Sequence, residues 1–286
     1  MSLIVSLTST SARLTVLRHT LISLVEQNHK PDRIVLCISK EPYLIDEGIN
    51  ALPEWLHAMI ERDEIELSWV KNIGPYRKLI PVYQQASDDD WIVTCDDDVI
   101  YGPNWLSSLV LSGQEYPSAI VCGKARRPAV NPWGRWQSYL NWQLVPPGSR
   151  GTELLPTGVA GVLYRKPLLD RGIMSSDDFM ELAPKQDDLW FHLARQRAGV
   201  EVVVSQEAGE HIYPIEAPGA LSATNASSKV SSWDNLFSAL IDRLMLKFRA
   251  YIGMSVCDND IVIERLKHYR GTARVYTTKD SLNSAE

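Results

Sequence analysis

The sequence predicts an α/β fold, in which a mixed sheet carries helices on both faces, and two observations support this prediction. Short apolar runs alternate with stretches whose apolar residues recur at helical spacing. Strands that alternate with helices favour a parallel or mixed sheet covered by its crossover helices. A chain of 286 residues is also long enough to bury a substantial core.

The first hundred residues give the clearest element predictions. Apolar residues recur at helical spacing from Leu14 as far as Gln27, and Gly74-Pro75 opens a helix that runs to about residue 85. The predicted strands cover residues 3–7, 33–39, 65–70 and 91–95, with another helix around 53–60. After residue 100 we expect strands near 119–122, 159–164 and 200–204, and a helix at about 188–197.

Three consecutive carboxylates, Asp96-Asp97-Asp98, follow the fourth predicted strand. Unpaired carboxylates at such a point repel one another, and a divalent cation such as Mg²⁺ or Mn²⁺ that also binds phosphates would resolve the conflict. Side chains alternate along a strand, so Asp96 and Asp98 share one face and Asp97 points away. Ligands of open α/β sheets bind at this edge, where strands end. The alternative interpretation is a solvated acidic turn.

Composition narrows the class of protein. A net charge of −6 argues against nucleic-acid binding by the whole surface. The four cysteines form no CxxC pair, which makes a zinc site improbable, and three of them lie in apolar runs, which indicates reduced, buried thiols. The amino terminus does not resemble a signal peptide, and no apolar run is long enough to cross a bilayer. We therefore expect a cytoplasmic protein.

Two further groups of charged residues could serve a phosphate-containing ligand. Arg77 and Lys78 follow Gly74-Pro75 at a helix start, where fixed cations and helix amides suit a phosphate, although a solvated helix end has the same pattern. Asp187-Asp188 lies near another helix start. These two acids suit either a cap of that helix or a general base separate from the metal site.

A histidine and an aromatic stretch complete the candidates. His211 follows the last predicted strand and could supply a neutral imidazole to the metal, or it could be structural. Aromatic faces beside hydrogen-bonding groups suit a sugar, and packing of a long insertion is the competing interpretation. The aromatic residues concerned are Trp133, Trp136, Tyr139 and Trp142.

Composition shifts after about Pro218, ahead of a new helix over residues 233–252 with one apolar stripe. Packing of this helix on the rest of the protein is the favoured interpretation. The alternative is a surface helix that touches an anionic membrane, where a lipid-linked acceptor could reside, because Arg243, Lys247 and Arg249 lie off the stripe.

The order of these motifs resembles the GT-A glycosyltransferases, and within them the inverting enzymes of the large family 2 type, including bacterial enzymes that build surface polysaccharides. The resemblance covers about residues 3–213. The stretches that carry it are IVSLTSTSARL, PDRIVLCIS, GPYRKLIP, DDWIVTCDDDVIYGPNWL, LPTGVAGVLYRK and QDDLWFHLAR.

The resemblance implies a Rossmann-like GT-A domain over residues 1–215 and a C-terminal helical extension over 216–286. The domain would divide into a nucleotide-sugar half (about 1–101) and an acceptor half (about 102–215). The fold would bind a nucleotide-sugar donor and a saccharide or lipid-linked acceptor, with Mn²⁺ or Mg²⁺ as cofactor. No nucleic acid is expected as a partner. The protein would be cytoplasmic or peripheral at the inner face of the membrane.

The resemblance also implies a role for each candidate residue. Asp98 would bind the metal, with Asp96 toward the ribose or metal and His211 completing the shell. Asp188 would be the base that deprotonates the acceptor, and Asp187 would orient it. Nucleoside, phosphate and sugar contacts would come from Thr8, Ser39, Arg77, Lys78, Asp96, Asp97 and Gly161, with Gly158–Gly161 as the floor.

Two positions depart from the family pattern. The base motif is usually Glu-Asp and here is Asp187-Asp188, and the Asp that often ends the second strand is replaced by Ser39-Lys40. The roles within the acid pair and the base of the nucleotide therefore stay open.

The expected reaction is direct displacement at the anomeric carbon of a nucleotide sugar, with inversion. The metal, Arg77 and Lys78 would stabilise the leaving diphosphate. The rival enzyme class is a metal-dependent phosphohydrolase or nucleotidyltransferase. The rival without catalysis is a GT-A-like protein that only binds sugar or partners.

Overall fold

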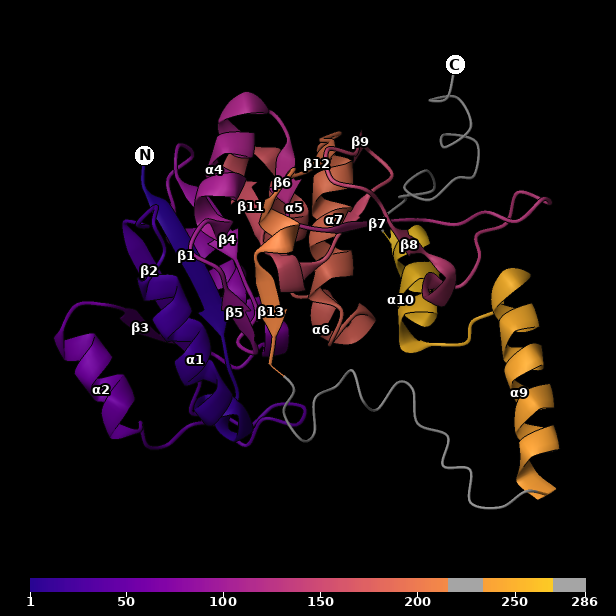
Figure 1. Cartoon of the computed structure of the whole chain (residues 1–286), viewed down its shortest axis with the longest axis horizontal. Helices are drawn as coiled ribbons and strands as arrows, with labels where there is room; N and C mark the ends of the chain where they lie inside the picture. Colours follow the sequence, from indigo (N-terminus) through magenta and orange to yellow (C-terminus); the bar gives the residue numbers. More distant parts are fainter. Residues whose placement is uncertain (216–233, 270–286) are drawn as a thin grey trace. The chain divides into compact units, whose positions relative to one another are not determined.

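The computed structural model describes residues 1–215 and 234–269, which belong to two compact units (Figure 1). The first unit comprises residues 1–126 and 144–215. The second comprises residues 127–143 together with the C-terminal part of the chain from residue 216. The aromatic stretch predicted to lie in the acceptor half therefore belongs largely to the second unit, with the C-terminal helices.

An eight-stranded mixed sheet forms the centre of the first unit, in the order β3-β2-β1-β4-β11-β6-β12-β9. Four strands from the first hundred residues run parallel, and the antiparallel β11 then separates β4 from β6. The strands are β1 (Leu3–Thr8), β2 (Arg33–Ile38), β3 (Glu66–Trp69), β4 (Trp91–Thr94), β6 (Ile120–Cys122), β9 (Arg150–Gly151), β11 (Val162–Arg165) and β12 (Val202–Val204). The predicted fold class, a mixed α/β sheet with helices on both faces, is confirmed.

Helices cover both faces because strand side chains alternate between them. Leu3, Val5 and Leu7 of β1 join one apolar core with residues of α1, α2 and α4. On the other face, Tyr164 of β11 packs against Phe191 of α7, with their ring centroids 6.1 Å apart. The helices are α1 (Leu14–Val25), α2 (Glu54–Glu61), α3 (Ile80–Gln85), α4 (Trp105–Glu115), α5 (Arg171–Met174), α6 (Phe179–Leu182) and α7 (Asp187–Arg197).

Short elements at the ends of the main strands shape the loops. Two small sheets join β5 (Val99–Tyr101) to β13 (Ile212–Pro214), and β7 (Ala125–Arg127) to β8 (Gln143–Leu144) and β10 (Leu155–Pro156). Five 3-10 turns also belong to the first unit: η1 (Ser11–Arg13), η2 (Gly74–Lys78), η4 (Gly158–Ala160), η5 (Lys166–Leu168) and η6 (Ala208–Glu210).

The buried side chain of Gln27 fixes the segment after the acidic run. Its Nε2 donates to the carbonyls of Tyr101 and Gly102, at 3.0 and 2.9 Å, and its Oε1 accepts from the amide of Leu106 at 3.0 Å. The end of α1 is thus tied to β5 and to the start of α4. Sequence periodicity predicted neither β5 nor α4.

In the second unit, the aromatic stretch packs against the C-terminal helices α9 (Asp234–Tyr251) and α10 (Asp258–Lys267). The buried Asp260 accepts hydrogen bonds from Ser138 Oγ and the amide of Tyr139, both at 2.7 Å. Trp142 is 2% exposed, and its ring lies 5.2 Å from that of Trp136. These contacts favour packing over sugar binding for this part of the stretch.

The predicted helix over 233–252 is α9, although Trp233 lies outside the described residues. Among the helices that the structure describes, none combines the length and the apolar character needed to cross a membrane.

Alanine substitution at two glycines with positive φ can distinguish the cost of backbone strain from the cost of a packing clash. Gly161 has φ +85°, and a Cβ there would lie 2.3 Å from the ring of the buried Trp105, whereas Gly199 has φ +69° with nothing within 4 Å. We expect Gly161→Ala to lower the free energy of unfolding by about 2–4 kcal/mol and Gly199→Ala by about 1–2 kcal/mol. Urea denaturation checks this difference, and equal losses for the two variants would contradict it.

Candidate active site

A buried lysine lies where three distant segments meet. Lys78 Nζ is 2.9 Å from Asp96 Oδ1 and 2.9 Å from Asp187 Oδ2. Lys78 ends η2, Asp96 follows β4, and Asp187 is the first residue of α7. Burial alone would lower the pKa of Lys78, but Asp187 and Asp96 outweigh it and hold that pKa well above its usual range. Lys78 is therefore a fixed positive charge between the two acidic motifs.

Gly158 lets the second acid approach this lysine. Its amide donates to Asp188 Oδ2 at 3.0 Å. A Cβ at Gly158 would lie 2.7 Å from Lys78 Nζ and 2.9 Å from Asp188 Oδ1, so a larger residue would push both groups away. Burial, with the neighbouring charge of Asp187, raises the pKa of Asp188 to about 7, while Lys78 opposes the rise. A carboxyl with a pKa near neutral pH is suited to general-base chemistry.

Side-chain exposure alternates along the acidic run as the sequence predicted, because Asp97 is buried and its two neighbours are partly exposed. Asp97 accepts a hydrogen bond from Ser9 Oγ and lies 3.1 Å from Nη1 of Arg13, which also pairs with Asp98. Burial raises the pKa of Asp97 to about 6, against the opposing effects of Arg13 and Ser9. Asp97 thus anchors the run inside the protein, while Asp96 and Asp98 remain partly exposed.

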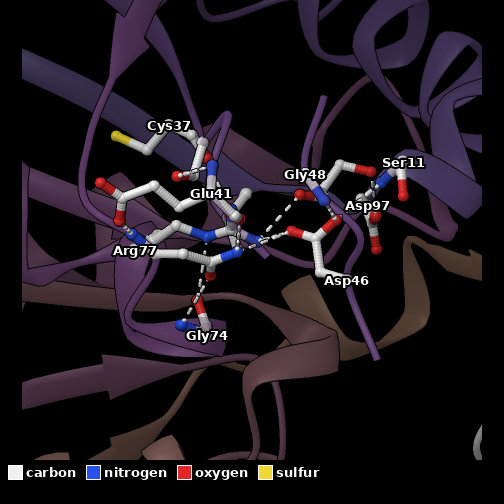
Figure 2. Close-up of polar contacts among 12 residues, drawn as sticks. Ser11, Cys37, Glu41, Asp46, Gly48, Gly74, Arg77 and Asp97 are labelled. Carbon is white, nitrogen blue, oxygen red and sulfur yellow. Dashed lines mark hydrogen bonds and ion pairs between the residues drawn. The ribbon is translucent and has the colours of Figure 1, made fainter. Parts of the chain in front are cut away.

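Arg77 lies inside the protein beside Asp46, as Figure 2 shows. Its side chain is 1% exposed, and Nη2 donates to Asp46 Oδ2 at 3.0 Å and to the carbonyl of Ser9 at 3.1 Å. The other oxygen of Asp46 accepts from the amides of Ser11 and Gly48, at 3.1 and 3.2 Å. Arg77 therefore joins the loops that follow β1 and β2, rather than standing open to a phosphate as its position in the sequence suggested.

Thr8 ends β1 and Ser39 follows β2, as expected, whereas Gly161 lies between η4 and the start of β11, and all three have partners inside the protein. Thr8 Oγ1 donates to the carbonyl of Cys37 at 2.6 Å, and Ser39 Oγ accepts from the amide of Glu41 at 3.1 Å. Gly161 follows η4 and lies against Trp105, whose Nε1 donates to the carbonyl of Ala160 at 2.8 Å. These contacts fix the Gly158–Gly161 segment next to Asp188.

His211 does not join the acidic run. It lies against Gly102, whose amide donates to the His211 carbonyl at 2.7 Å. In the β5/β13 ladder it stands at one end, whereas the carbonyl of Asp98 accepts from the amide of Ile215 at the other. Within residues 1–215 and 234–269, no three or more His, Cys, Asp or Glu side chains gather in a way that could hold a metal. Of the predicted metal ligands, Asp96 and Asp98 are the two partly exposed members of the acidic run.

Sequence reasoning missed Arg13 and Asp46. Both lie on loops that follow strands, β1 and β2, at the carboxyl edge that carries the acids. Their positions after strands were the available signal, because charged residues there converge on one edge of the sheet.

Removing the Arg77 side chain tests whether it serves the fold. We expect Arg77→Ala to lower the free energy of unfolding by about 3–5 kcal/mol, because it leaves Asp46 buried without its cation. Arg33→Ala is the control. It breaks an exposed pair with Glu66 at 2.8 Å and should cost at most about 1 kcal/mol. Chemical denaturation measures both, and a small loss for Arg77→Ala would instead favour a role in ligand binding.

The chain was compared with curated protein sequences and with solved structures. No curated protein sequence matches the chain. The solved structures that resemble the chain include two at low identity. S. aureus TarS 1-349 in complex with UDP-GlcNAc is 16% identical with a TM-score of 0.48, over 100% of this chain and 76% of that one. A 4-diphosphocytidyl-2C-methyl-D-erythritol synthase is 11% identical with a TM-score of 0.44, over 78% of this chain and 97% of that one. Neither score reaches 0.5, so neither likeness adds to the assignment.

The family model named Glycosyl transferase family 2 matches residues 8–174, more than half of the chain. The match begins at the last residue of β1 and includes β2, β3, β4, the acidic run and the Gly158–Gly161 segment, and it ends before Asp187. The chain belongs to glycosyl transferase family 2.

Proposed function

We propose that this glycosyltransferase moves a sugar, with inversion, from a nucleoside-diphosphate donor to a hydroxyl of a saccharide or glycolipid acceptor, in bacterial polysaccharide or glycoconjugate synthesis. The observation that supports it best is the convergence of two acidic motifs, one after β4 and one at the start of α7, on Lys78 and Gly158. A single displacement step requires the donor and the acceptor to lie next to each other, so the acids that serve them must lie close together.

Asp96 and Asp98 would hold Mg²⁺ or Mn²⁺. Carboxylate oxygens suit these ions, and two carboxylates are enough where the phosphates of the donor and water fill the remaining positions. When bound, the metal supplies positive charge to the leaving diphosphate. Thr8 ends β1 and Ser39 directly follows β2, and we propose that the nucleoside lies there.

We assign the base to Asp188, with Asp187 as its neighbour. Asp188 takes the proton of the acceptor hydroxyl, whose oxygen bonds to the anomeric carbon on the face opposite the diphosphate. The bond to the diphosphate breaks in the same step, so the configuration inverts. A pKa of about 7 lets Asp188 be substantially ionised near neutral pH while remaining a useful proton acceptor.

A donor panel tests the assignment. We expect one nucleotide sugar to be consumed in the presence of Mn²⁺, with a glycosylated acceptor or a free sugar of inverted configuration as product. Asp98→Ala should lose at least about 100-fold of the metal-dependent turnover, and Asp188→Asn should lose as much while still binding the donor. Mass spectrometry, NMR of the anomeric product and calorimetry measure these quantities.

The products separate the proposal from its rivals. Release of inorganic phosphate would identify a phosphohydrolase, and release of pyrophosphate would identify a nucleotidyltransferase. Binding of sugar without turnover would identify a protein that has no catalytic role. Normal turnover by Asp98→Ala or by Asp188→Asn would contradict the roles given to those residues.

We also propose that α9 contacts an anionic membrane at the cytoplasmic face. Between residues 243 and 251 the helix carries three cations and no acid. At 100° per residue, Leu244, Phe248 and Tyr251 fall within an arc of about 60°. They are 59%, 57% and 39% exposed, whereas Ala250, on another face, is buried. An apolar arc flanked by cations is typical of a helix that lies on a membrane surface.

An exposed tryptophan extends this apolar face. The ring of Trp133 lies edge-on to that of Tyr251, with centroids 6.2 Å apart, and is 69% exposed. Tryptophan and tyrosine favour the interfacial region of a bilayer. A membrane contact would bring the enzyme to a lipid-linked acceptor.

Sedimentation with vesicles tests this contact. We expect the protein to pellet with phosphatidylglycerol-containing vesicles and less with pure phosphatidylcholine. Phe248→Asp should reduce the bound fraction about 10-fold by removing apolar contact and adding repulsion. Leu111→Asp, at a 64% exposed position on α4, is the control and should bind normally. Vesicle binding unaffected by Phe248→Asp, or self-association that depends on Phe248 without vesicle binding, would contradict the proposal.

A further inference from the structure

We propose that Lys78 is a positioning residue that orients the acceptor-side acids relative to the donor-side acid, rather than a ligand of the diphosphate. This inference rests on the proposed function, because it names what Lys78 does within that site. Its ammonium group is 2.9 Å from carboxylate oxygens of both Asp96 and Asp187, which belong to different motifs. The two acids are thereby held on either side of one charge.

Burial makes this arrangement specific. Lys78 is 6% exposed, so its ammonium group has exchanged water for carboxylate partners. An ammonium group without those partners would be strongly disfavoured at such a depth. Turning Lys78 toward a phosphate would require it to leave one of its carboxylates. The Lys78 side chain is therefore poorly placed to move toward a bound phosphate, and well placed to hold two acids at a fixed separation.

Gly158 sets the distances in this cluster. Its amide holds Asp188, and the position of its missing Cβ lies 2.7 Å from Lys78 Nζ, 2.9 Å from Asp188 Oδ1 and 3.5 Å from Asp96 Oδ1. Only a residue without a side chain lets the three charged groups converge there. The structure thus couples Asp188, the proposed base, to Lys78 by close packing and by charge.

The charges around Asp188 give the expected direction of a pH effect. Burial raises its pKa most, Asp187 and Asp96 raise it further, and Lys78 and the Gly158 amide lower it. Removing the positive charge of Lys78 therefore leaves the acids to repel one another. The base then ionises only at higher pH, and the acid limb of the kcat profile moves upward.

Lys78→Met tests the inference with Lys166→Met as a matched control. Lys166 is a partly buried lysine whose Nζ donates to the carbonyl of Ala86 at 2.9 Å, and no carboxylate partner is described for it. With the donor selected by the panel, we expect Lys78→Met to lose at least about 100-fold in kcat. The donor KM should change less than about 3-fold, and the acid limb should move to higher pH. Lys166→Met should leave all three quantities unchanged.

Gly158→Ala displaces the ammonium group without removing any charge. The atoms its Cβ would meet are the ends of side chains, so the fold can adjust at little cost while Lys78 and Asp188 move. We expect a loss in kcat of about 10-fold or more with little change in thermal midpoint. A 10-fold rise in donor KM for Lys78→Met with kcat retained would overturn the inference and make Lys78 a donor ligand. Unchanged kinetics would overturn it as well.

A thermal double-mutant cycle does not depend on any activity. The shifts in unfolding midpoint of Lys78→Met and Asp187→Asn should be strongly non-additive in the double variant, because each removes the other's partner. Lys78→Gln replaces Lys78→Met if the latter does not fold. Non-additivity without turnover of any nucleotide sugar would support the contact and refute the proposed function. Additive shifts would refute the contact itself.

Discussion

The arrangement of the site depends on one electrostatic constraint, which is that carboxylates from two distant segments must share a buried point. Asp96 and Asp187 are brought together by the sheet and by α7, and neither could be partly desolvated beside the other without a cation. Lys78 supplies that cation from η2. The same charge restrains the pKa of Asp188, which burial and its neighbours raise to about 7. The ammonium group of Lys78 therefore both stabilises the packing of these segments and limits the pKa of the proposed base.

A second set of contacts fixes the loops that carry these groups. Arg77, the neighbour of Lys78 in η2, turns inward to Asp46 and to the carbonyl of Ser9. Ser9 in turn donates to Asp97, the buried member of the acidic run. The two adjacent residues of η2 thus have different roles. Arg77 connects the loops that follow β1 and β2, and Lys78 pairs with Asp96 and Asp187. Displacing η2 would disturb both at once.

The sequence was sufficient for the fold class and for most elements of the first hundred residues, because apolar runs and helical periodicity directly report burial. The pairing of β5 with β13 was not predictable, since it depends on contacts between segments more than a hundred residues apart. The acidic run could be located from its place after a predicted strand, and Asp187-Asp188 from its place near a predicted helix start. The burial of Arg77 could not be predicted. Nothing in the local sequence distinguishes Arg77 from Lys78, and the partner that holds Arg77 inside the protein, Asp46, belongs to another loop.

The two outer acids of the run differ in how firmly they are held, and this difference bears on how the proposed metal site would fill. Asp96 is paired with Lys78, which is buried and shared with Asp187. Asp98 is paired with Arg13, whose side chain is 34% exposed and can return to water at little cost. A cation that binds both acids would therefore compete first with the contact between Arg13 and Asp98, and Arg13 would keep its 3.1 Å contact with the buried Asp97. Lys78 would stay in place, because its partner Asp187 on the acceptor side is not involved in such an exchange.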